Sequence, residues 1–79
     1  MKLTYDPRHN VAYIRLLEKV AEVETVRISD ELNIDMAPDG TVYGIELLNA
    51  NEQLGKGDGG VLVLVNEALG DCREIPLNR

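Results

Sequence analysis

The sequence predicts a mainly β protein of the α+β class, an antiparallel β-meander of five to six short strands with one short helical turn near residues 49–54. Apolar and polar residues alternate with a period of two through most of the first 50 residues, which is typical of half-buried strands. Clusters of Pro, Asp, Asn and Gly separate these stretches. With 79 residues, the chain is expected to form a single domain, residues 1–79.

The first two strands are predicted on either side of a short loop. Leu3 and Tyr5 alternate with polar neighbours, and a turn is expected where Asp, Pro and Asn gather at residues 6–10. The second strand, residues 11–17, has apolar side chains on both faces. Such a strand is expected in the middle of a sheet or covered on both sides.

The third strand is predicted to contain a β-bulge. In a regular strand, Ala21 and Val23 would face one side of the sheet and Val26 and Ile28 the other. One extra residue near Glu24 or Thr25 would bring all four to the same side. Residues 32–36 form a clean fourth strand. The Pro-Asp-Gly turn at residues 38–40 then leads into a fifth strand, residues 41–48, which is apolar on both sides.

The remaining segments are a helical turn, a linker and an extension. Asn49 is expected to cap a helical turn that ends at Gly55. Residues 55–60 contain four glycines and are expected to form a mobile linker, which separates the meander of residues 1–54 from a C-terminal strand extension, residues 61–79. The apolar run 61–65 predicts a buried strand, and residues 72–77 predict a last strand at an edge, because Pro76 lacks an N–H.

Charge and composition exclude several classes of function. Eight Lys and Arg against fourteen Asp and Glu give a formal net charge of −6, which opposes binding to nucleic acid or to an anionic membrane. No apolar stretch approaches the roughly 20 residues that span a bilayer, and the N-terminus has no secretory h-region. A single cysteine, Cys72, cannot close an internal disulfide. The expected location is the cytoplasm.

No catalytic constellation, cofactor motif or metal-ligand spacing is present, so the protein is not expected to be an enzyme. The glycine-rich segment lacks the Ser or Thr that must follow the lysine of a phosphate-binding loop. The acidic residues lack the spacing of a calcium-binding loop. His9 is expected in an exposed loop with no fixed acid beside it, which suits no acid–base mechanism.

Acidic residues around the third strand form a first candidate interaction surface. They could dock a basic protein, because complementary charge speeds encounter between partners. The alternative is a solvated strand face that resists aggregation. The candidates are Glu22, Glu24, Asp30 and Glu31.

Glu46 lies in an otherwise apolar stretch and is the centre of a second candidate site. Together with Tyr13 and Tyr43 it could orient a polar ligand in a shallow groove. The alternative is that Glu46 forms a cross-strand pair with Arg15 or Arg27.

The apolar run that follows the linker is a candidate dimer interface. Strands with apolar residues on both faces cannot all be covered by one small helix, and an identical chain is the simplest cover. We expect a homodimer in which Val61, Val63 and Val65 form the interface. The alternative is that this run folds back on its own sheet.

Several short blocks together resemble a small prokaryotic family called domain of unknown function 2283, over about residues 1–54. The blocks are Tyr5-Asp6-Pro7, Val11-Ala12-Tyr13-Ile14-Arg15-Leu16, Asn33-Ile34-Asp35, Pro38-Asp39-Gly40 and Gly44-Ile45-Glu46-Leu47-Leu48-Asn49-Ala50. The resemblance implies a compact β-rich fold with no assigned activity, cofactor or catalytic residue. It also suggests a toxin–antitoxin partnership as one role.

Two hypotheses of function follow. The first is a non-enzymatic protein-interaction module, which could be the antitoxin-like partner of a basic protein. The second is a small-ligand-binding or catalytic protein with its site around Glu46, Tyr13 and Tyr43.

Overall fold

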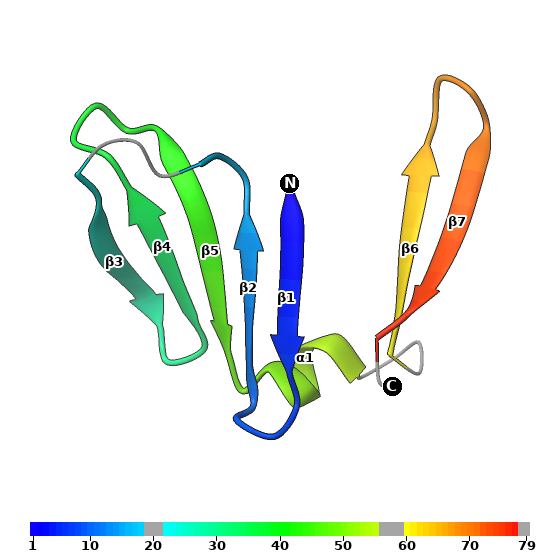
Figure 1. Ribbon diagram of the computed structural model, residues 1–79, viewed down its shortest axis with the longest axis horizontal. Helices are drawn as coiled ribbons and strands as arrows, with labels where there is room; N and C mark the ends of the chain where they lie inside the picture. Colours follow the sequence, from blue (N-terminus) through cyan, green and yellow to red (C-terminus); the bar gives the residue numbers. More distant parts are fainter. Residues whose placement is uncertain (19–21, 56–59, 78–79) are drawn as a thin grey trace.

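The computed structural model describes residues 1–18, 22–55 and 60–77, and in these residues it has seven antiparallel strands in two sheets and one short helix (Figure 1). The predicted fold class is therefore confirmed, with seven strands instead of five to six. The elements are β1 (Lys2–Asp6), β2 (Val11–Arg15), β3 (Glu24–Ser29), β4 (Leu32–Met36), β5 (Val42–Leu48), α1 (Ala50–Gly55), β6 (Val61–Asn66) and β7 (Asp71–Pro76).

The five N-terminal strands form one sheet in the order β1-β2-β5-β4-β3, which is not the simple meander that the sequence predicted. β5 is inserted between β2 and β4, and β3 lies at the edge. The reason is burial: β5 is the longest strand of the sheet and rich in apolar residues, so it gains most from two neighbours. β3 carries Glu24 and Arg27, and charged side chains protect an exposed edge from pairing with other chains.

The sheet contains two irregularities, and neither lies where the predicted bulge was placed. The β3–β4 register shifts between Arg27 and Ser29, so the extra residue is Ile28 and not Glu24 or Thr25. The β4–β5 register shifts after Asp35, which leaves Tyr43 as the extra residue there. Strand β3 begins only at Glu24, and Ala21 lies outside the described residues.

The predicted turn between β4 and β5 is confirmed. The N–H of Gly40 donates to the carbonyl oxygen of Ala37 at 2.9 Å, and Gly40 has a φ of 92°. The N–H of Thr41 donates to Oδ1 of Asp39 at 3.0 Å. Glycine is favoured here because a side chain would be strained at this positive φ.

Two asparagines attach α1 to the sheet. Asn10 and Asn49 both have positive φ, 60° and 56°, a conformation that Asn adopts more readily than most residues. The backbone N–H of Asn51 donates to Oδ1 of Asn10 at 2.7 Å, so the helix is capped by a side chain from the β1–β2 turn. The side chain of Asn49, which was expected to cap, donates instead to Glu31 at 2.9 Å. Ala50 is completely buried at this junction.

Strands β6 and β7 form a separate hairpin, which we call the arm (residues 60–77). It stands beside the β1 side of the sheet, with α1 below the space between them (Figure 1). The predicted strand 61–65 is confirmed as a strand, but the expectation that it is buried is wrong, because all of β6 except Val61 is exposed. The linker segment 56–59 lies outside the described residues.

No helix in the described ranges is long and apolar enough to cross a membrane.

Candidate functional site

One face of the five-stranded sheet is apolar across its whole width. The strand register aligns one aliphatic side chain from every strand in a row, because cross-strand partners share a face. From β1 to β3 this row is Leu3, Ile14, Ile45, Ile34 and Val26. None of the five is fully buried, although this face would have to form the core of a protein of this size.

The buried core is correspondingly small. Among the described residues, the only buried side chains of the apolar type are three alanines, Ala12, Ala37 and Ala50. No large side chain there is fully buried. A sheet normally buries one face against another layer, whereas the apolar face here is only partly covered in the single chain.

The arm presents a second apolar surface towards this sheet. Leu62 and Ile75 are cross-strand partners, and Leu64 and Leu77 follow them on the same face, which we call the inner face of the arm. A hollow of about 440 Å³ separates the inner face from the sheet. Every side chain that lines this hollow is apolar: Met1, Leu3, Ile14, Leu62, Leu64, Ile75 and Leu77.

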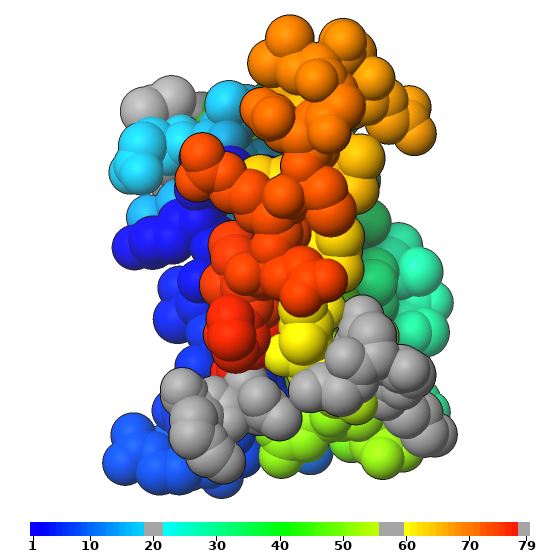
Figure 2. Space-filling view, turned by 90° about the vertical axis from the view of Figure 1, so that its right-hand side faces the viewer, coloured from blue at the N-terminus to red at the C-terminus, as the bar shows by residue number. Residues whose placement is uncertain are grey.

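The outer face of the arm carries Val63, Val65 and Cys72. Figure 2 shows the arm from the side away from the sheet, with its turn projecting beyond the N-terminal strands. The three valines of the predicted dimer interface share this outer face: Val63 and Val65 are 45% and 53% exposed, whereas Val61, next to Gly60, is partly buried. The leucines of β6, which the sequence analysis did not single out, face the sheet instead.

The opposite face of the sheet is polar, and its centre is Tyr13. The Tyr13 hydroxyl donates to Oδ2 of Asp35 at 2.7 Å, and Thr25 donates to Oδ1 of the same carboxylate at 2.7 Å. Burial, and then the hydrogen bond to Asp35, raise the pKa of the Tyr13 phenol. The ring crosses β5 at Gly44, where the Cβ of any other residue would overlap it.

Glu46 is on this polar face as the cross-strand partner of Tyr13, so two members of the predicted groove lie side by side. The third member of the predicted groove, Tyr43, is the extra residue of the β4–β5 bulge and has no partner in β4. On the other side, its carbonyl oxygen accepts a hydrogen bond from the N–H of Leu16 at 2.9 Å. Glu46 accepts a hydrogen bond from Asn33 Nδ2 at 3.0 Å. The structure does not show the predicted pairing of Glu46 with an arginine. Nη1 of Arg15 lies 3.7 Å from Oε1 of Glu18, and Arg27 forms an ion pair with Asp30.

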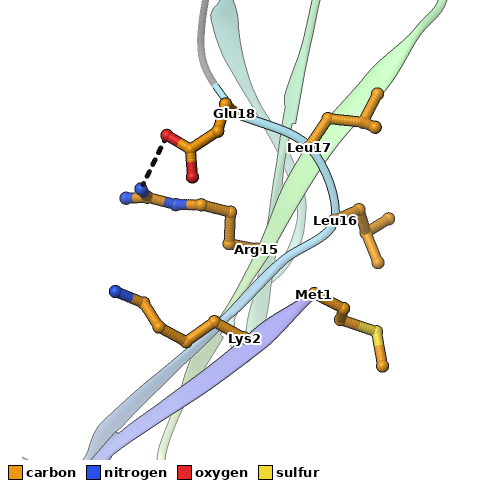
Figure 3. Close-up of a pocket in the computed structure, with 6 residues that line it drawn as sticks. All are labelled: Met1, Lys2, Arg15, Leu16, Leu17 and Glu18. Atoms are coloured by element: carbon orange, nitrogen blue, oxygen red, sulfur yellow. Dashed lines mark ion pairs between the residues drawn. The ribbon is translucent and has the colours of Figure 1, made fainter.

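A second hollow, of about 390 Å³, lies where β1 begins and β2 ends (Figure 3). Lys2 and Arg15 are cross-strand partners and extend to the same side, while Met1, Leu16 and Leu17 extend to the other. Glu18 partly neutralises this pair of cations. Sequence analysis missed the pair because its members are distant in the chain. None of these side chains is a nucleophile poised beside a general base.

The predicted acidic surface is split between the two ends of β3. Glu22 and Glu24 lie at its start, and Asp30 and Glu31 lie in the turn that follows it. Asp30 is hydrogen-bonded to Arg27, and Glu31 accepts the hydrogen bond from Asn49. Among the described residues, Glu22 and Glu24 at the start of the strand are exposed and have neither an ion pair nor a side-chain hydrogen bond, unlike Asp30 and Glu31.

His9 is exposed, as predicted, but the expectation that no acid stands beside it is wrong. Its Nδ1 lies 2.7 Å from Oδ2 of Asp6. This hydrogen bond lowers the pKa of the Asp6 carboxyl. Both side chains lie at the surface, and no nucleophile joins them. In the described part of the chain, no group of three His, Cys, Asp or Glu could hold a metal ion.

Residues 2–51 match the model of a protein family described as Protein of unknown function (DUF2283). The chain belongs to the DUF2283 family. No curated protein and no solved structure matches it. The DUF2283 segment covers the whole five-stranded sheet and the beginning of α1, and the arm lies beyond it. Both faces of the five-stranded sheet, the apolar one and the polar one around Tyr13, thus belong to the DUF2283 region, whereas the inner face of the arm does not.

Proposed function

We propose that this DUF2283 protein is a non-enzymatic protein-interaction module whose apolar surface is the contact surface for another polypeptide chain. The observation that carries the proposal is the half-buried apolar row across the sheet, which continues into the exposed leucines of the arm. Monomeric proteins rarely expose a large contiguous apolar surface, and where one exists it usually marks an interaction site. The surface consists of the row Leu3, Ile14, Ile45, Ile34 and Val26 together with the inner face of the arm.

A basic protein is the partner that the charge of the chain favours, and an antitoxin-like role would be one form of this function. The net charge is −6, and Glu22 and Glu24 are exposed at the free edge of the sheet. Opposite charge on a partner would accelerate encounter and fix its orientation. Cys72 has no second cysteine in this sequence with which to form a disulfide, which favours a reducing compartment such as the cytoplasm for this interaction.

The alternative, a ligand site around Tyr13, Glu46 and Tyr43, has less support. The polar atoms of Tyr13 and Glu46 make hydrogen bonds to Asp35 and Asn33 within the sheet. The two hollows described above are lined by other residues. This polar face is better explained as the solvated side of the sheet.

The proposal is tested by purifying the tagged chain from its own host and measuring the mass of the complex by light scattering. We expect a mass clearly above the 8.8 kDa of one chain. A basic partner should be lost when Glu22 and Glu24 are both changed to lysine, with an unchanged circular dichroism spectrum. A single chain of 8.8 kDa with nothing bound would overturn the proposal.

A further inference from the structure

We propose that a second copy of this chain covers the apolar surface, so that the sheet face and the inner face of the arm form a two-fold symmetric dimer interface. This inference rests on the proposed function, because it names the occupant of the contact surface. It also moves the interface from the valines of the arm to its leucines. The inner-face residues are Leu62, Leu64, Ile75 and Leu77.

The exposed area of the chain matches what a dimer needs to bury. A compact folded protein of 8.8 kDa exposes about 4,800 Å², whereas this chain exposes 5924 Å². The excess is about 1,100 Å² per chain, and a standard interface buries about 800 Å² per partner. The radius of gyration agrees, since it is 14.0 Å where about 11.6 Å is expected for 79 residues.

The arm needs a cover that its own sheet does not provide. A two-stranded hairpin is at best marginally stable in water without packing on one of its faces. Leu62 and Leu64 face their own sheet and yet remain 39% and 53% exposed, because the hollow of about 440 Å³ separates them from the sheet. Apolar side chains from a second chain can fill this space and support the hairpin at the same time.

The surface is suited to contact a copy of itself. In a two-fold dimer the same patch is used on both subunits, so it must be self-complementary. An aliphatic surface meets this condition, since two aliphatic surfaces attract without any matching of charge. The patch is also continuous: Leu3 and Ile14 belong to the row on the sheet and line the hollow under the arm.

Glu24 and Arg73 at the margins of this surface favour one orientation of the copies, although Asp71, opposite Asn66, also lies on the inner face of the arm. Glu24, opposite Met36, lies at the β3 edge of the sheet's apolar face, and Arg73, opposite Leu64, lies on the inner face of the arm. Their strands, β3 and β7, lie at opposite sides of the molecule (Figure 1). A two-fold axis parallel to the strands brings the arm of one copy to the β3 edge of the other. Opposite charges then meet at both ends of the interface.

Two neighbouring residues of β6 provide a matched test. Leu64 and Val65 are both 53% exposed but point to the inner and the outer face of the arm. We would compare Leu64→Lys with Val65→Lys by analytical ultracentrifugation over a dilution series of purified protein, alongside the wild type. A lysine buried in a dimer interface without a partner is strongly unfavourable, whereas an exposed one is tolerated.

We expect the wild type and Val65→Lys to sediment at twice 8.8 kDa. Leu64→Lys should weaken the dimer by at least about thirtyfold, the effect of an interface hot spot. Circular dichroism of the sheet should be retained in both variants, since the arm makes few contacts with the sheet. The conservative variant Leu64→Met should remain dimeric. This control would show that the loss of the dimer in Leu64→Lys comes from the charge and not from replacing this leucine as such.

Three results would overturn the inference. A wild type that is monomeric at every concentration, with a compact radius of gyration, would show that the arm closes on its own sheet. Loss of the dimer in Val65→Lys but not in Leu64→Lys would assign the interface to the outer face. A purified monomer that still forms a complex with a host protein would leave the proposed function standing and remove only the second copy as occupant.

Discussion

The sheet and the arm are built from similar strands but depend on different kinds of support. Three strands of the sheet have a neighbour on each side, and the junction with α1 buries Ala12 and Ala50. The two strands of the arm pair only with each other, and β7 is exposed throughout. The comparison teaches that a strongly apolar, β-branched sequence determines where a strand forms, whereas burial depends on which surface is available to cover it.

The largest effect should come from removing an aliphatic group at the centre of the sheet. Ile45 stands between Ile14 and Ile34 in the apolar row. Ile45→Ala is expected to lower the free energy of unfolding by about 2 kcal/mol or more, because it removes apolar contacts on both sides. Urea unfolding at a fixed protein concentration measures this change.

Val65→Ala is the matched control on the arm. Val65 is 53% exposed on the outer face, so the free energy of unfolding should change by less than about 0.5 kcal/mol. Equal losses in the two variants would mean that the outer face of the arm is buried in solution and that the sheet and the arm do not differ in the way described.

A smaller loss is expected from a methyl group at Gly44. Any Cβ at this position overlaps the Tyr13 ring, so Gly44→Ala should displace the ring and break its hydrogen bond to Asp35. The expected destabilisation is about 1–2 kcal/mol, from the lost hydrogen bond and the strain. In a Tyr13→Ala background the same substitution should cost much less, and a double-mutant cycle by urea unfolding measures this coupling. Purely additive effects would contradict the contact.

Much of the fold is readable from the sequence because its signals are local. The alternation in β1, β2, β4 and β5 and the Pro-Asp-Gly turn each lie within a few neighbouring residues, and the structure confirms all of them. The order of the strands is not local. The placement of β5 between β2 and β4 depends on how several strands share the limited apolar cover, and the turns alone favour a meander.

The candidate surface was only partly readable for the same reason. The sequence indicated that the run 61–65 needs a cover, but alternation alone does not tell which side of an all-apolar strand faces the sheet. The structure assigns Leu62 and Leu64 to the inner face. Two other contacts join residues far apart in the chain, and no local sequence pattern predicts them: the cross-strand pair of Lys2 and Arg15, and the capping of α1 by Asn10.

The smallest effect concerns pH and the polar face of the sheet. The pKa of Tyr13 is raised above its ordinary value of 10.0 in the folded protein, so folding favours the protonated phenol. Its contribution to stability is fully present below pH 10.0 and is lost as the pH rises through the raised folded pKa. Urea unfolding from pH 8 to pH 11 should show this decline.

Tyr13→Phe should flatten that decline, because it removes the titrating hydroxyl and keeps the ring over Gly44. An equally steep loss of stability in the variant would show that other groups cause it. The arm contains no tyrosine, so the effect should report on the sheet alone.

The most direct test of the central claim is to detect contacts between two copies of the chain. A sample mixed from ¹³C-labelled and unlabelled protein, studied by isotope-filtered NOE spectroscopy, reports only on contacts between chains. We predict intermolecular NOEs between methyl groups of the inner face, such as Leu64, and methyl groups of the apolar row, such as Ile34 and Ile45. Intermolecular NOEs confined to Val63 and Val65, or none at all, would contradict the account.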